Sequence, residues 1–140
     1  MRVLVTAALA MLCLTVVGCD KGLVDPSQNV NDTFTGTINP FQAGGGIHTL
    51  NITRNGEYFI TFTSLTPPLA NLTIPTDIRL TAAVSGSCVF ASQIVGDNPA
   101  SIAGKQVLNG VISPGTFCLW IVDEGYYLVP ETYVVTVNHP

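Results

Sequence analysis

Charged residues are scarce in this chain. Asp, Glu, Lys and Arg make up 10% of its 140 residues, and 9 acids outnumber 5 cations to give a formal net charge of -4. The cations are scattered along the sequence, whereas binding to nucleic-acid phosphates requires clustered Lys and Arg side chains. We therefore expect no nucleic-acid partner.

Histidine is also rare, which limits the catalytic chemistry of the chain. It occurs as His48, on an expected strand, and as His139, which we expect to be frayed because it is the penultimate residue. Nucleophilic catalysis needs a nucleophile, a base and an orienting acid in one pocket, and no serine lies in a Gly-x-Ser-x-Gly elbow. The sequence therefore predicts no catalytic residue and a protein that is not an enzyme.

Long apolar runs are missing beyond the first 18 residues. The run from Val3 to Val17 is itself shorter than the roughly 20 residues that a membrane-spanning helix needs. Because this run follows Arg2 and precedes the small residue Gly18, it has the pattern of a secretory signal. An uncleaved membrane helix is the alternative interpretation.

The residues Val16-Val17-Gly18-Cys19 resemble the lipobox of bacterial lipoproteins. The resemblance implies that residues 1–18 are a lipoprotein signal peptide and that acylated Cys19 anchors the mature protein to a membrane. Each buried methylene contributes about 0.8 kcal/mol, so two or three acyl chains hold much longer than one. The protein would lie in the bacterial cell envelope, facing the periplasm or the cell surface, with inner or outer membrane left open. A secreted protein with an unrelated cysteine is the alternative.

The cysteines divide by position once this resemblance is accepted. Cys13 leaves with the signal and Cys19 carries lipid, so Cys88 and Cys118 remain in a compartment where disulfides persist. We expect these two to be bonded, which would stabilise the fold by on the order of 3 to 4 kcal/mol. Two buried free thiols are the alternative. A zinc site would need further cysteines or histidines.

The rest of the chain predicts an all-β fold. Residues 19–31 are polar and aperiodic, as expected of a lipidated, flexible tether. Residues 32–140 contain short alternating segments separated by turn residues, without a helical period. This pattern favours a single antiparallel β-sandwich domain of about eight strands, similar to a jelly roll.

Turn residues predict how some of these strands connect. Asn55-Gly56, between alternating runs at 47–53 and 58–63, is typical of a hairpin in which both turn residues have positive φ. Ser113-Pro114-Gly115-Thr116 has the residue preference of a type II turn before a doubly covered strand at 117–122. Residues 96–104 are expected to form a long loop.

Two closing segments resemble the bacterial pre-peptidase C-terminal domain, a small β-sandwich of secreted proteins. They are Gly115-Thr116-Phe117-x-Leu119-x-Ile121 and Thr132-Tyr133-Val134-Val135-Thr136-Val137. Residues 77–80 and 34–38 match earlier parts of the family's pattern, so the resemblance covers about residues 32 to 140. It implies a sandwich fold and an exported setting, and it brings no catalytic residue.

Loop residues offer two weaker candidate sites. Asp97, Asp123 and Glu124 could supply oxygen ligands to calcium, although none lies in a dedicated calcium motif and a solvated turn is the alternative. No other cofactor is expected. Tyr126 and Tyr127 follow Gly125 in an expected loop and could stack against a sugar or peptide.

These features together predict a non-catalytic, lipid-anchored sandwich of the envelope. Such a module would bind a macromolecular partner, either protein or glycan, or support the cell surface. A calcium- or carbohydrate-binding module of a secreted or envelope system is the alternative function.

Overall fold

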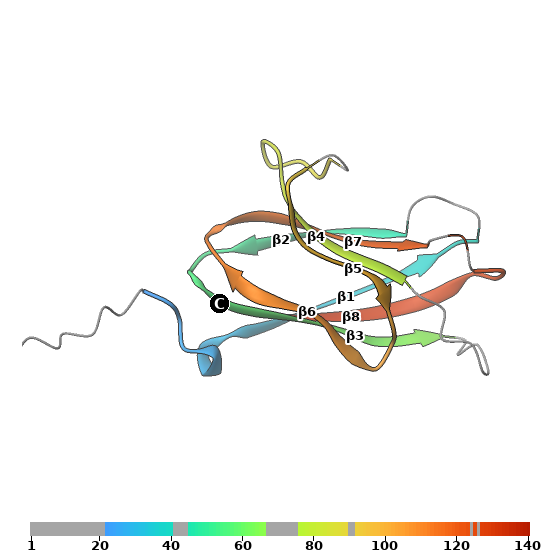
Figure 1. Ribbon diagram of the computed structural model, residues 1–140, viewed down its shortest axis with the longest axis horizontal. Helices are drawn as coiled ribbons and strands as arrows, with labels where there is room; N and C mark the ends of the chain where they lie inside the picture. Colours follow the sequence, from blue (N-terminus) through green and yellow to red (C-terminus); the bar gives the residue numbers. More distant parts are fainter. Residues whose placement is uncertain (1–21, 41–44, 67–75, 90–91, 124, 126) are drawn as a thin grey trace, which may run out of the picture.

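The computed structural model describes residues 22–40, 45–66, 76–89, 92–123, 125 and 127–140, and within them the chain forms two antiparallel four-stranded sheets (Figure 1). One sheet has the order β1-β8-β3-β6 and the other the order β2-β7-β4-β5. The strand bounds are β1 Val30–Ile38, β2 Gly46–Ile52, β3 Gly56–Thr66, β4 Thr76–Ala82, β5 Ile94–Ser101, β6 Lys105–Ile112, β7 Gly115–Asp123 and β8 Glu131–His139. We call the first sheet A and the second sheet B.

Successive strands alternate between the two sheets, except that β4 and β5 are neighbours in sheet B. This order is that of a jelly roll, in which the chain wraps repeatedly around one core. The predicted fold class, a single antiparallel sandwich of about eight strands, is confirmed.

The core lies between the sheets and follows the alternation of the sequence. Because successive side chains of a strand point to opposite faces, one residue in two faces the other sheet. In β2 and β3, for example, Leu50, Ile52, Tyr58, Ile60 and Phe62 are buried on this inner face. The largest fully buried apolar side chains are those of Ile38, Leu50, Ile60, Phe62, Ile78, Leu80, Leu119, Ile121, Tyr127, Tyr133 and Val135.

The hairpin predicted at Asn55-Gly56 is wrong. Both runs are strands, but β2 pairs with β7 in sheet B, whereas β3 pairs with β6 and β8 in sheet A. The turn therefore crosses from one sheet to the other. Gly56 does not have a positive φ. A Cβ on it would lie 2.7 Å from the Cβ of Pro140, so the glycine permits close packing and not a special turn.

The type II turn predicted at Pro114-Gly115 is also wrong. That turn needs a positive φ at its second central residue, and Gly115 lacks one. Gly115 is instead the first residue of β7, and the turn carries the chain from β6 in sheet A to β7 in sheet B. The predicted central strand is confirmed, because β7 lies between β2 and β4 with Cys118 and Trp120 buried on its outer face.

The long loop predicted at 96–104 is largely a strand. Ile94–Ser101 forms β5, which pairs with β4 at the edge of sheet B. Its position at the edge tolerates Pro99, which has no backbone N–H to donate. Most of β5 is exposed, so its sequence lacks the apolar alternation that identifies the inner strands.

The later part of the segment predicted as a tether, from Val24 onward, belongs to the folded unit. Val24 forms a bridge to Gly56, Pro26–Gln28 form a 3-10 turn, and β1 begins at Val30 and not at residue 32. Residues 1–21, which include the predicted signal peptide and Cys19, lie outside the described residues.

Candidate functional site

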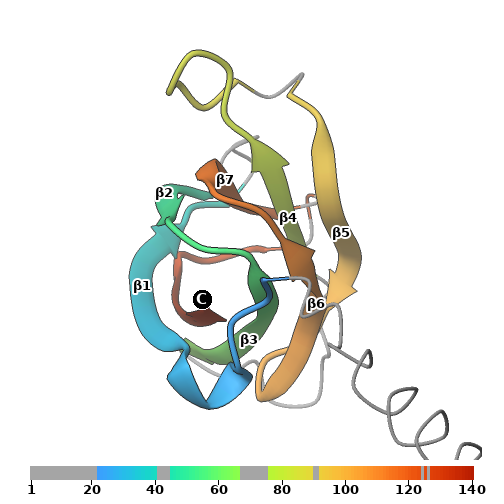
Figure 2. The ribbon, with the colours of Figure 1, turned by 90° about the vertical axis from the view of Figure 1, so that its left-hand side faces the viewer.

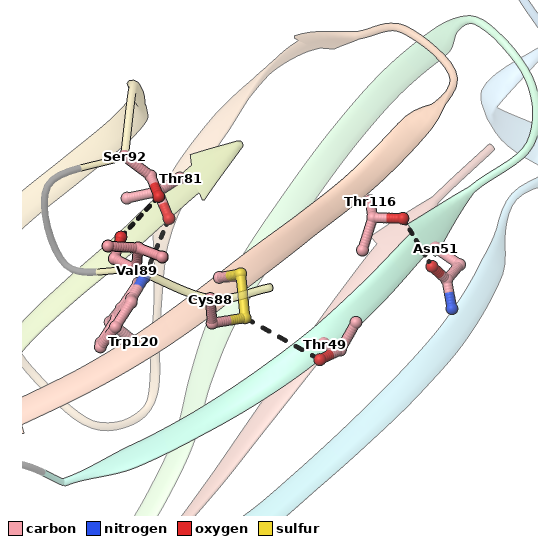
Figure 3. Close-up of a disulfide and its surroundings, with 9 residues drawn as sticks. Thr49, Asn51, Thr81, Cys88, Val89, Ser92, Thr116 and Trp120 are labelled. Atoms are coloured by element: carbon pink, nitrogen blue, oxygen red, sulfur yellow. Dashed lines mark hydrogen bonds between the residues drawn. A yellow bond between two sulfur atoms is a disulfide. The ribbon is translucent and has the colours of Figure 1, made fainter. Parts of the chain in front are cut away.

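The predicted disulfide is present between Cys88 and Cys118 (Figure 3). It joins the segment that follows β4 to the middle of β7, across 30 positions of sequence. Cys118 is buried and the Oγ1 of Thr49, on the neighbouring strand β2, lies 3.9 Å from the Cys88 sulfur. The bond therefore holds residues 83–89 against the outer face of sheet B.

This segment is a short hairpin with apolar side chains on its surface. Ser85 and Gly86 both have positive φ, and Val84 pairs with Ser87 across them, as in the tight turns that connect antiparallel strands. Val84 and Val89 are largely exposed, at 54% and 46%.

Trp120 anchors the same face of sheet B, where it is 7% exposed. Its Nε1 donates a hydrogen bond of 2.9 Å to Oγ1 of Thr81, which is fully buried (Figure 3). Trp120 therefore packs as a structural residue on this face.

Asp97, the first predicted calcium ligand, is part of an ion-pair cluster on the outer face of sheet B. The Arg79 guanidinium donates from Nε to Asp97 Oδ1 at 3.0 Å and from Nη2 to Asp77 Oδ2 at 2.8 Å. Arg79 thus faces two carboxylates at once. The cation already supplies the positive charge that a metal would bring to this position.

Asp123, the second predicted ligand, faces the opposite side of sheet B. It lies at the end of β7 on the core side, and its Oδ1 accepts hydrogen bonds from the backbone N–H groups of Gly125 and Tyr127 at 2.8 and 3.4 Å. Strand alternation therefore separates it from Asp97. Glu124 lies outside the described residues, among which no three His, Cys, Asp or Glu side chains gather as in a metal site.

Tyr127 corrects the prediction of an exposed aromatic pair. Its side chain is fully buried, and its hydroxyl forms a hydrogen bond with Oγ1 of Thr76. Burial raises the pKa of Tyr127, with the negative charges of Asp123 and Glu131 adding to the effect. Tyr127 cannot stack against a ligand, because it fills the space between the sheets. Tyr126 lies outside the described residues.

Glu131 is a buried acid that the sequence interpretation missed. It has no exposed surface, and neither carboxyl oxygen has a hydrogen-bond partner in the part of the chain that the structure describes. Burial raises the pKa of this carboxyl above its ordinary value of 4.5. Its place in β8 could have revealed it, because Glu131 shares the inward parity of Tyr133, Val135 and Val137.

His48 lies where the edge strands β1 and β2 meet. Its Nε2 is 2.7 Å from the hydroxyl of Tyr133, and its ring stacks on Phe34 with 4.8 Å between centroids. Burial lowers the pKa of His48, so the imidazole is mainly neutral at pH 7. A Cβ on Gly46 would collide with the Tyr133 hydroxyl, so the glycine makes room for this contact.

His139 is not frayed, contrary to the expectation from its place near the chain end. It lies in β8 opposite Val30, is 5% exposed, and its Nε2 is 3.1 Å from Asp32 Oδ2. Pairing with β1 fixes the end of the strand. His48 and His139 lie at different positions along the sandwich, each with its own partner.

The first described residues pack against one end of the sandwich. The N–H of Val24 donates to the carbonyl of Asn55 at 2.7 Å. Nδ2 of Asn29 donates to the carbonyl of Glu57 at 2.9 Å and to Oδ1 of Asn138 at 2.8 Å. The chain therefore approaches the domain along the turn between β2 and β3. No helix within the described ranges is long and apolar enough to cross a membrane.

A scan against protein-family models and a search of the curated proteins found no match to this chain. The resemblances to bacterial lipoproteins and to the pre-peptidase C-terminal domain stay predictions, which rest on the residues quoted for them.

Proposed function

We propose that the protein is a non-catalytic, lipid-anchored module of the bacterial cell envelope, which binds a macromolecular partner or supports the cell surface. The lipobox at Val16 to Cys19 carries this proposal. The disulfide between Cys88 and Cys118 supports it, because such bonds persist in exported proteins and are rare in the cytosol.

Exposed apolar side chains indicate where a partner would gain most from contact. In sheet B, the apolar side chains of Ile47 on β2 and Ile94 at the start of β5 are largely exposed. In the disulfide-linked hairpin that lies on this sheet, the side chains of Val84 and Val89 are largely exposed as well. Burial of apolar area is the main favourable term in protein association. A protein or glycan partner is the class that we propose.

Metabolic labelling with a fatty acid tests the anchor. The wild-type chain should incorporate the label, and Cys19→Ala should lose it. Cys13→Ala is the matched control, because Cys13 lies within the predicted signal and its replacement should leave labelling intact. Label retained by Cys19→Ala, or none in the wild type, would exclude the anchor.

The alternative of a calcium- or carbohydrate-binding module makes a different prediction. Melting of the folded domain would then shift by several degrees with calcium or with a member of a glycan panel, since a ligand that binds the folded state raises its stability. Such a shift would favour this alternative, and no shift would leave a protein as the proposed partner.

A further inference from the structure

The way the chain reaches the domain restricts which end can face a membrane. Figure 2 looks onto the end that carries the C-terminus, and the blue N-terminal segment passes beside it. Gly56 lies close to both the C-terminus and the N-terminal segment. A Cβ built on it would lie 2.7 Å from the Cβ of Pro140 and 3.5 Å from the Cβ of Val24. We call this the Pro140 end.

The opposite end of the sandwich is defined by the strand register. Ile38 pairs with Glu131 and Thr76 with Asp123 there. We call it the Glu131 end. Because β8 runs over nine residues from one end to the other, the two ends lie about 30 Å apart at roughly 3.3 Å per residue.

The connection from Cys19 to the folded unit is short. Only Asp20, Lys21, Gly22 and Leu23 separate Cys19 from Val24, whose N–H is hydrogen-bonded to the domain. Even fully extended, a chain of this length spans at most about 18 Å. This limit is smaller than the length of the sandwich, so a lipid on Cys19 holds the Pro140 end nearer the bilayer.

Some side chains at this end would suit contact with a lipid surface, because they are apolar or positively charged. Leu23, Val30 and Val111 are exposed by 42%, 51% and 61%. Arg54 lies at the turn and donates to the carbonyl of Gln28 at 3.4 Å. Acidic residues are present at this end too, so charge alone does not orient the domain, and the covalent connection sets the orientation.

We propose that the protein sits with its Pro140 end on the lipid surface and its Glu131 end directed away from it. The lipid-facing surface comprises Leu23, Val30, Val111 and the turns at 53–55 and 113–114. This inference rests on the proposed acylation of Cys19. It assigns the partner-binding role to the Glu131 end and to the outer faces of the sheets, which stay accessible.

A fluorophore on one end or the other tests the orientation in the full-length, membrane-extracted protein. Thr53→Cys and Thr132→Cys are matched variants, because both threonines are exposed and lie near the Pro140 end and the Glu131 end. With residues 1–18 removed and Cys19 acylated as proposed, the new thiol alone is free to react, since Cys88 and Cys118 are bonded. The NBD-labelled proteins are placed in phosphatidylethanolamine and phosphatidylglycerol vesicles that contain a lipid with a nitroxide on its headgroup.

We expect the nitroxide to quench the NBD fluorescence at position 53 and to leave the fluorescence at position 132 unchanged. Equal quenching, or stronger quenching at 132, overturns the orientation when intact mass shows acylated Cys19. A mass without acyl chains overturns the lipid anchor itself, and the two failures are thus distinguished.

A longer connection is the second variant. Insertion of about 15 Gly and Ser residues between Gly22 and Leu23 adds a flexible chain that no longer confines the domain. Quenching at position 53 should then fall to the level seen at 132. If quenching at position 53 did not change, the short connection would not be the cause of the orientation.

Discussion

The two ends of the sandwich differ in how their polar side chains are paired. At the Pro140 end, Asn29 donates to Glu57 and Asn138, Asn138 donates to Asn31 at 3.0 Å, and His139 pairs with Asp32. These interactions join β1, β3 and β8 to the N-terminal segment. Each such bond contributes about 1 kcal/mol on average, so several bonds hold the Pro140 end together, although Oδ1 of Asn29 has no hydrogen-bond partner among the described residues.

The Glu131 end is different, because it buries a carboxyl whose oxygens have no hydrogen-bond partner among the described residues. Desolvation makes the charged form of a buried carboxyl unfavourable unless hydrogen bonds or a cation compensate. Tyr127 next to it is buried as well, and its hydroxyl is satisfied by Thr76. The comparison indicates that the buried carboxyl of Glu131 gives its end of the sandwich an energetic cost.

Removal of the disulfide should have the largest effect. The double variant Cys88→Ala and Cys118→Ala should lose on the order of 3 to 4 kcal/mol of unfolding free energy, because the bond closes a loop of 30 positions in the unfolded chain. Urea unfolding measures the loss. Reduced wild-type protein is the control, since it breaks the bond without replacing a side chain, and a loss below about 1 kcal/mol in both would contradict the prediction.

Sequence patterns were sufficient for the disulfide, from the two cysteines left in residues 32–140, and for the strands other than the largely exposed β5, since alternation reports burial directly. They could not tell which sheet a strand joins. The runs around Asn55-Gly56 have one apolar face each, and that pattern fits two paired strands as well as two strands in opposite sheets. Only contacts distant in sequence, such as that of Gly56 with Pro140, separate the two arrangements.

The candidate site was harder to predict than the fold for the same reason. Tyr127 was expected in an exposed loop, and Asp97 and Asp123 were expected as calcium ligands, because all three were assigned to loops. Burial of Tyr127 depends on the space between the sheets, and the parity of β5 and β7 places the two acids on opposite faces. Neither fact is encoded in the local sequence.

Glu131→Leu should stabilise the protein at neutral pH by about 1 to 3 kcal/mol, the cost of leaving a buried polar group unpaired. The cause is the removal of a carboxyl whose two oxygens have no partner among the described residues. Urea unfolding at about pH 7 measures the gain. Destabilisation by the variant would show that the Glu131 end does not carry the cost that the comparison assigns to it.

The pH dependence sharpens this test. Because burial raises the pKa of Glu131 above 4.5, the folded state binds more protons than the unfolded state between 4.5 and the folded-state pKa. The stability contributed by the neutral acid is therefore complete below 4.5 and lost as pH rises through the folded-state pKa. Glu131→Gln, which does not titrate, should lose this component of the pH profile, and an unchanged profile would contradict the assignment.

Tyr127→Phe should have a smaller effect at the same end. The variant keeps the ring that fills the space between the sheets but loses the hydrogen bond with Thr76, at a cost of about 1 kcal/mol. Thr76→Val is the matched partner, and the double variant should lose less than the sum of the single variants because the two hydroxyls share one bond. Additive losses, measured by urea unfolding, would exclude that coupling.

Asn29→Ala should have the smallest effect on global stability and the clearest local one. Its Nδ2 holds the N-terminal segment to Glu57 and Asn138, so its loss should free that segment while the core strands stay folded. Hydrogen exchange at the Val24 amide should become faster, because the N–H is protected by its bond to Asn55, whereas exchange at Leu119 in β7 should not change. Ser27→Ala is the control, since Ser27 is exposed and its backbone N–H, which donates to Asp25, is kept in the variant. If the Val24 amide exchanges at the wild-type rate in Asn29→Ala, the segment is held by its backbone alone, and the Pro140 end depends less on side-chain bonds than the comparison indicates.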